Sequence, residues 1–118
     1  MLSRLEKAVK KYELGIDEKT IRSVKSQCVY EEISVKGLNF KKIRDVLILT
    51  GTILEEDEQN RIYVGIVKGG LFNSNPSIVV LNQQEDMVVI GAFAREGIIK
   101  QKTAIKAIER IKSAFRTY

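Results

Sequence analysis

The sequence contains no histidine, no tryptophan, one proline and one cysteine among its 118 residues. The absence of histidine excludes histidine-based acid–base catalysis and most zinc and haem sites, because histidine supplies the base or the ligand there. The single cysteine, Cys28, excludes a disulfide bond within the chain and favours a reducing compartment. We therefore expect a cytoplasmic protein that binds no metal ion and no cofactor.

Long apolar runs are missing as well. No run approaches the ~20 apolar residues that a membrane-spanning helix needs, and residues 1–7 include charged side chains where an export signal would be apolar. We therefore expect no membrane span and no export signal. The residues that are present, 44% apolar and 30% charged, are typical of a globular chain. The length fits a single domain over residues 1–118.

The periodicity of the apolar residues predicts a helix near each end of the chain. In the first segment they recur at steps of three and four residues, at Leu2, Leu5, Val9 and Tyr12. Residues 1–27 are therefore expected to be helical, with a first stop at Gly15. Residues 98–116 predict an amphipathic C-terminal helix, because apolar side chains form one stripe and charged side chains occupy the other side.

Residues 28–95, between the helices, are predicted to form mainly strands. Runs of β-branched residues alternate there with short polar links. Strands joined by short links pair antiparallel, because a parallel return needs a crossover of a dozen or more residues. A sheet with an apolar face also needs a cover, which the terminal helices can supply. We therefore expect an α+β fold, in which N-terminal and C-terminal helices pack on a meander-like antiparallel sheet of four or five strands.

Residues 40–54 fit two structures. The apolar residues at the start of this segment have the spacing of a short helix, whereas β-branched residues dominate its second half. Because Gly51 would weaken a helix, we favour a strand from about Arg44. A helix is the alternative for residues 40–48, and we expect it to divide the sheet into two hairpin groups.

The net charge of +5 is unevenly distributed along the chain. Residues 1–25 carry +3, residues 26–94 carry −3 and residues 95–118 carry +5. The basic side chains of the predicted C-terminal helix share an outer face, which makes this face a candidate surface for a protein partner or a polyanion. The residues of this candidate surface are Lys102, Lys106, Arg110 and Arg116. The alternative is a solvated helix face whose cations favour the helix C-terminus.

A second candidate site is the glycine-rich segment at residues 69–76, which is predicted to be a loop. Glycine beside asparagine and serine can present backbone N–H groups to an anion or another ligand, and an exposed phenylalanine can anchor a partner. The candidate residues are Gly69, Gly70, Phe72, Asn73 and Asn75. The lysine and hydroxyl residue of a nucleotide-binding P-loop do not follow these glycines, and a plain connection is the alternative.

Three further segments were considered as sites. The carboxylate run at residues 55–58 lacks the spacing of a calcium-binding loop, which predicts a solvated hairpin tip and no metal site. Cys28 has no histidine to act as its base, so we expect a small buried apolar side chain. Residues 14–22 resemble the turn and recognition-helix start of helix-turn-helix DNA-binding proteins. Lys11 replaces the small residue that this family has before the turn, and two short helices are the alternative.

These features together favour a non-catalytic regulatory or protein-interaction module. The sequence carries no histidine, no cofactor motif and no metal-ligand set, and its basic helices could complement its acidic sheet between copies of the chain. We therefore expect a protein partner or self-association into a homo-oligomer. The alternative is a nucleic-acid-binding protein that uses the basic terminal helices, and an enzyme is the third class considered.

Overall fold

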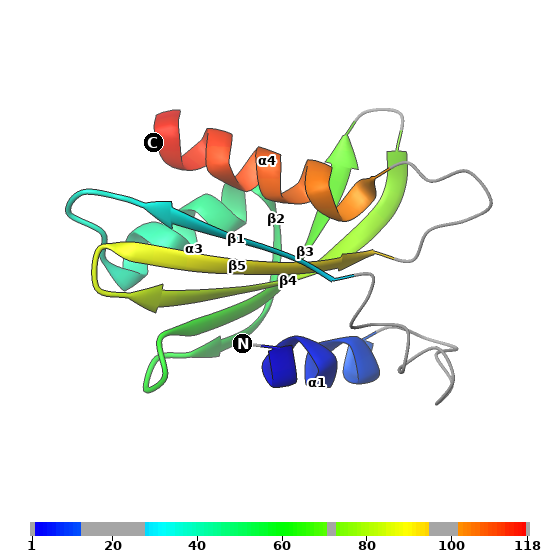
Figure 1. Cartoon of the computed structure of the whole chain (residues 1–118), viewed down its shortest axis with the longest axis horizontal. Coiled ribbons are helices and arrows are strands. Elements are labelled where there is room, and N and C mark those ends of the chain that lie inside the picture. The colour runs from blue at the N-terminus through cyan, green and yellow to red at the C-terminus, as the bar shows by residue number, and fades with distance from the viewer. Residues whose placement is uncertain (1, 13–27, 71–72, 95–101, 118) are drawn as a thin grey trace.

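The expected α+β class is confirmed by an antiparallel sheet with helices at both ends of the chain (Figure 1). The computed structural model describes residues 2–12, 28–70, 73–94 and 102–117. Along the chain these residues form α1 (Leu2–Tyr12), β1 (Val29–Ser34), α3 (Phe40–Thr50), β2 (Gly51–Asp57), β3 (Ile62–Gly70), β4 (Asn73–Gln84), β5 (Met87–Ala94) and α4 (Thr103–Thr117). The parts of the helix predictions at residues 13–27 and 98–101 lie outside the described residues.

The five strands pair in the order β1-β5-β4-β3-β2, and every pair is antiparallel. Strands β2 to β5 form a meander, as expected, whereas β1 returns to lie beside β5. Since β1 and β2 occupy opposite edges, the segment that contains α3 crosses from one edge of the sheet to the other (Figure 1). The sheet stays whole, so the expectation that a helix in this segment would divide it is wrong.

The strand predicted from about Arg44 is also wrong, because Phe40–Thr50 forms helix α3. The Asn39 side chain begins this helix by accepting a hydrogen bond from a backbone N–H of the first turn at 2.8 Å. The buried residues of α3 recur at helical spacing, at Phe40, Ile43, Val46, Leu47 and Thr50. Burial of this stripe outweighs the weak strand preference of the β-branched residues. The strand starts only at Gly51, where a Cβ atom would lie 2.0 Å from the Ile66 carbonyl oxygen.

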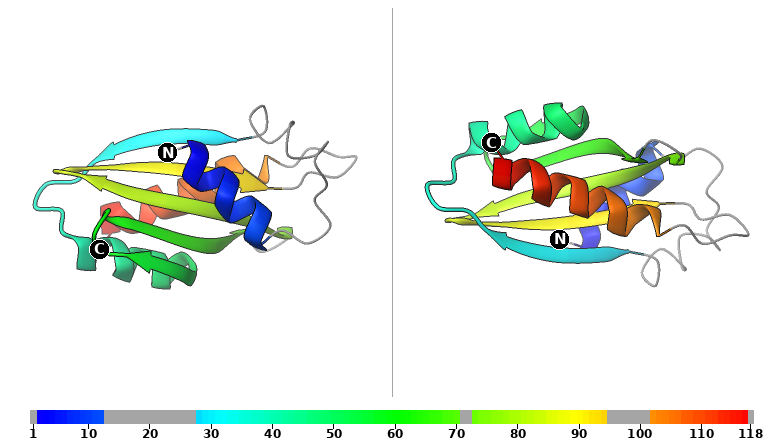
Figure 2. Two further views of the ribbon diagram at one scale, coloured as in Figure 1. Left: turned by 90° about the horizontal axis from the view of Figure 1, so that it is seen from below. Right: turned by 90° about the horizontal axis from the view of Figure 1, so that it is seen from above.

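Helices α3 and α4 cover one face of the sheet and α1 covers the other, which gives three layers (Figure 2). The larger core joins α3 and α4 to inward-facing strand residues, among them Tyr63, Val79, Leu81 and Ile90. In the smaller core α1 contributes Leu5, Ala8 and Val9. The molecule therefore presents two helical surfaces, one on each side of the sheet. Within the part of the chain that the structure describes, no helix combines the length and the apolar character that a membrane crossing requires.

Candidate functional site

The four predicted cationic residues of the C-terminal helix lie on its outward side. Lys102 directly precedes α4 and the other three lie within it, and all four side chains are exposed. The opposite side of α4 is buried, through Thr103, Ala104, Ala107, Ile108, Ile111 and Phe115. The structure thus brings the four cations to one surface, as the sequence predicted, while the partner of this surface stays a prediction.

Helix α3 adds charged and apolar side chains that the sequence analysis did not include. It packs beside α4 in the same layer (Figure 2) and exposes Lys41 and Arg44. Its Ile48 and Leu49 side chains are 52% and 65% exposed, and Ile105 of α4 is 43% exposed. We call the exposed cationic and aliphatic side chains of this layer the cationic helical face, which comprises Lys41, Arg44, Ile48, Leu49, Lys102, Ile105, Lys106, Arg110 and Arg116. The α3 residues were missed because their segment was assigned to a strand.

Another cation of α4 is used inside the molecule. The Lys112 ammonium donates a hydrogen bond to Glu31 Oε1 of β1 and forms an ion pair with it. The same ammonium lies 3.9 Å from Glu109 Oε1, and the Lys112 side chain is only 18% exposed. This contact connects α4 to the edge strand β1. We therefore assign Lys112 a structural role and do not include it in the cationic helical face.

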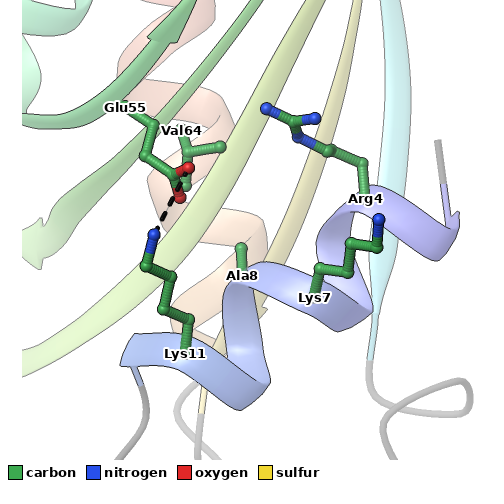
Figure 3. Close-up of a pocket in the computed structure, with 6 residues that line it drawn as sticks. All are labelled: Arg4, Lys7, Ala8, Lys11, Glu55 and Val64. Carbon is green, nitrogen blue, oxygen red and sulfur yellow. Dashed lines mark ion pairs between the residues drawn. The ribbon is translucent and has the colours of Figure 1, made fainter.

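Basic residues of α1 and the Glu55 carboxylate of β2 line a small pocket (Figure 3). The Arg4 guanidinium lies 3.4 Å from Asp57 Oδ2, and the Lys11 ammonium lies 3.7 Å from Glu55 Oε1. The Tyr12 hydroxyl donates a hydrogen bond to the other Glu55 oxygen at 2.8 Å. The pocket has a volume of about 190 Å³, and its lining residues are Arg4, Lys7, Ala8, Lys11, Glu55 and Val64. Because carboxylates pair with two of its three cations, this pocket is the seam that fastens α1 to β2.

The carboxylate run at residues 55–58 is therefore not simply a solvated hairpin tip. Its first three residues belong to β2, and the turn begins at Glu58. Hydrogen bonds from the side chain and the backbone of Asn60 lower the pKa of Asp57, and the charge of Arg4 lowers it further. Among the residues that the structure describes, no three histidine, cysteine, aspartate or glutamate side chains are grouped so that they could hold a metal ion.

The predicted ligand loop at residues 69–76 is largely strand, so the loop prediction is wrong. Strand β3 continues through Gly70 and β4 begins at Asn73, and these two residues pair with each other. Pro76 lies opposite Lys68 of β3, and within the described residues the pairing of β4 with β5 begins at Ser77. Four of the five candidate residues lie in strands, namely Gly69, Gly70, Asn73 and Asn75. The fifth, Phe72, lies outside the described residues. A ligand or partner role for them stays a prediction.

The predictions for Cys28 and for residues 14–22 can also be compared with the structure. Cys28 is partly buried against the smaller core, and burial raises the pKa of its thiol. A raised pKa disfavours the thiolate that a nucleophile requires, which agrees with the expected packing role. The segment that resembles a helix-turn-helix protein, residues 14–22, lies outside the described residues.

A second pocket, with a volume of about 310 Å³, lies between the start of α3 and the hairpin of β2 and β3. Its lining residues are Phe40, Lys41, Arg44, Glu56, Glu58 and Tyr63. The Phe40 and Tyr63 rings are stacked, with centroids 4.2 Å apart and planes 18° apart. The Tyr63 hydroxyl donates a hydrogen bond to Glu56 Oε1 at 2.9 Å. Burial and this carboxylate raise the pKa of Tyr63, so the phenol stays a donor at neutral pH.

No protein-family model matches the chain, and no curated protein matches it. Among solved structures, a TBP-like protein from Parabacteroides distasonis ATCC 8503 is similar at 6% identity and a TM-score of 0.38, over 64% of this chain and 60% of that chain. A DUF4468 family protein from Bacteroides ovatus ATCC 8483 is similar at 11% identity and a TM-score of 0.39, over 92% of this chain and 90% of that chain. The chain thus spans about 60% of the length of the first structure. At these TM-scores neither likeness carries an argument about function.

Proposed function

We propose that this protein is a non-catalytic regulatory or interaction module of the cytoplasm, and that its cationic helical face binds an acidic, partly apolar surface of a protein partner. The observation that carries the proposal is the mixture on this face. Exposed cations of α3 and α4 stand in one layer with three exposed aliphatic side chains, Ile48, Leu49 and Ile105. The cations supply long-range attraction and the aliphatic side chains supply buried apolar area, a combination that protein interfaces use.

The same mixture disfavours the nucleic-acid alternative. Phosphate binding gains nothing from aliphatic side chains, and proteins that bind single-stranded nucleic acids also use exposed aromatic rings for stacking. The aromatic residues that α3 and α4 contribute in the described chain, Phe40 and Phe115, are buried at 8% and 6% exposure. Glu109 adds a negative charge to the exposed side of α4. A duplex would thus leave the aliphatic side chains of the face without a matching surface.

Self-association through opposite charges has less support than a separate partner. The acidic strands that would have to receive a second copy's basic helix already pair with basic residues of their own chain. Glu31 pairs with Lys112, Glu55 with Lys11 and Asp57 with Arg4. Fewer carboxylates are therefore left to attract another molecule.

The test uses a fluorescent peptide of alternating aspartate and leucine, a 20-base-pair duplex and phosphatidylserine vesicles as three probes. Anisotropy and vesicle co-sedimentation are measured at 150 mM salt. We expect the peptide to bind tightest, and we expect Lys106→Glu with Arg110→Glu to weaken peptide binding at least ~10-fold, the size expected for lost charge-assisted contacts. The matched control, Lys10→Glu with Lys36→Glu, makes the same change in net charge at exposed positions outside the face and should leave affinity within ~2-fold.

Replacing Ile48 and Leu49 by serine separates the alternatives further. This variant should weaken binding of the peptide and leave any duplex binding unchanged, because phosphates gain nothing from aliphatic contact. Tighter binding of the duplex or the vesicles than of the peptide would contradict the proposal. Equal losses in the two charge-reversal variants would show that net charge, and not this face, attracts the probe.

A further inference from the structure

The pocket between α3 and the β2–β3 hairpin has walls of opposite charge. Lys41 and Arg44 project from α3 on one side, and Glu56 and Glu58 come from β2 and its turn on the other. The stacked Phe40 and Tyr63 rings form an apolar floor, and their residues are 8% and 1% exposed. Charged groups thus surround an aromatic base on two facing sides.

The facing charges do not neutralise each other. Among the described residues, Lys41, Arg44 and Glu58 take part in no ion pair, although all of them line one pocket. Glu56 uses one carboxylate oxygen to accept the Tyr63 hydroxyl bond at 2.9 Å, which holds this carboxylate at the pocket wall and leaves its other oxygen available. The pocket therefore separates two positive groups from two negative groups.

The charge balance of the pocket selects the class of occupant. A simple anion would be attracted by the cations of α3 and repelled by the hairpin carboxylates. A simple cation would be attracted by the carboxylates and repelled by α3. A ligand with both charges satisfies both walls, and each of its ends forms charge-assisted hydrogen bonds. We propose that this pocket binds a small zwitterion with an apolar middle, of the chemical class of short peptides and amino acids. The carboxylate end lies toward Lys41 and Arg44, and the ammonium end lies toward Glu56 and Glu58.

The size of the pocket fits this class. Its volume of about 310 Å³ stands at the lower end of the ~300–1,000 Å³ range of ligand pockets. It equals the volume of roughly ten water molecules at ~30 Å³ each, which gives enough room for a dipeptide. The aromatic floor supplies apolar contact for the middle of such a ligand. This proposal does not depend on the proposed interaction with a protein partner, although the pocket shares Lys41 and Arg44 with the cationic helical face.

The experiment is an NMR titration of the ¹⁵N-labelled full chain with glycyl-leucine, followed through backbone amide shifts. We expect saturable shifts at millimolar concentration that include the amides of residues 41, 44 and 58. N-acetyl-glycyl-leucine lacks the ammonium and glycyl-leucine amide lacks the carboxylate, so each should bind about 10-fold more weakly, because each loses charged hydrogen bonds. Free leucine and a tripeptide vary the distance between the two charges and identify the best length.

Variants on the two walls test the site itself. Glu58→Gln and Lys41→Gln, both at exposed positions, should each weaken glycyl-leucine binding at least ~5-fold, whereas Glu32→Gln on β1, at the sheet edge opposite β2, should not change it. Absence of saturable shifts up to 20 mM would overturn the proposal, and so would equal binding of the acetylated peptide. Unchanged glycyl-leucine binding by Lys106→Glu with Arg110→Glu is expected, so failure of this site and failure of the partner-binding face can be distinguished.

Discussion

Helices α1 and α4 are both basic and amphipathic, yet they use their cations differently. On α1, Lys11 points at the Glu55 carboxylate of β2 (Figure 3), and Arg4 pairs with Asp57 of the same strand. On α4 the outward cations stand exposed, and Lys112 pairs with an edge strand. Both helices pack on central strands of the sheet, α1 on β4 and β5 and α4 on β3, β4 and β5. The difference arises because Arg4 and Lys11 reach the carboxylates of β2 from the flank of α1, whereas the exposed cations of α4 lie on the side opposite its buried residues. The sequence pattern of basic residues is similar in the two helices, so the ion pairs of α1 follow from the position of the β2 carboxylates and not from the pattern itself.

The largest expected effect is a difference in unfolding free energy between substitutions of an apolar residue in α1 and one in α4. Leu5 of α1 is fully buried, whereas Ile105 of α4 is 43% exposed. Leu5→Ala should lower the free energy of unfolding by about 2–5 kcal/mol, because it leaves a cavity in the smaller core. Ile105→Ala should change it by less than about 0.5 kcal/mol, since this side chain belongs to the cationic helical face. Urea unfolding followed by circular dichroism measures both values. A similar cost for the two variants would show that Ile105 is a core residue and would remove it from the binding surface.

A smaller effect distinguishes the two kinds of cation on α4. Lys112→Met removes the partner of Glu31 and should cost about 1 kcal/mol of unfolding free energy, the upper range for a partly exposed ion pair. Lys106→Met removes an exposed cation and should change stability by less than about 0.5 kcal/mol. Repeating both unfolding curves in 1 M sodium chloride should reduce the difference between them, because salt screens the pair. A loss at Lys106 equal to that at Lys112 would contradict the division between structural and exposed cations.

The fold class could be predicted from the sequence because its evidence is local. Periodicity identified α1, α4 and the meander, and short links required antiparallel pairing. Helix α3 could not be assigned in the same way, because strand preference and helical spacing conflict in one segment. What decided the conflict is the burial of Ile43 and Leu47 against the sheet, a contact that exists only after the strands have assembled. The position of β1 beside β5 is equally non-local.

The candidate surfaces were predictable to a similar degree. The four cations of α4 lie at helical spacing, so one face could be predicted from sequence alone. The contribution of α3 depended on its helical structure, and its Ile48 and Leu49 were therefore missed. The glycine-rich segment looked like a loop by composition, but pairing of Gly70 with Asn73 extends the hairpin into it. The pocket that Phe40 and Tyr63 line combines residues of α3 with the β2–β3 hairpin, and no sequence pattern predicts that contact.

The smallest expected effect is a pH-dependent change in stability that arises from Asp57, at the contact between α1 and β2. Hydrogen bonds from Asn60, with a contribution from Arg4, hold the pKa of Asp57 below its ordinary value of 3.8. A carboxyl whose folded pKa is depressed stabilises the fold above the unfolded pKa, and this contribution is lost as pH falls through the folded pKa. The urea midpoint of the wild-type chain should therefore exceed that of Asp57→Asn by a constant amount from pH 7 to about pH 5. The difference should shrink below about pH 4, because the protonated carboxyl then resembles the neutral amide. Asn60→Ala should reduce the same pH-dependent difference by removing the main donor. A difference that does not shrink between about pH 5 and about pH 2 would show that packing, and not the charge of Asp57, is responsible.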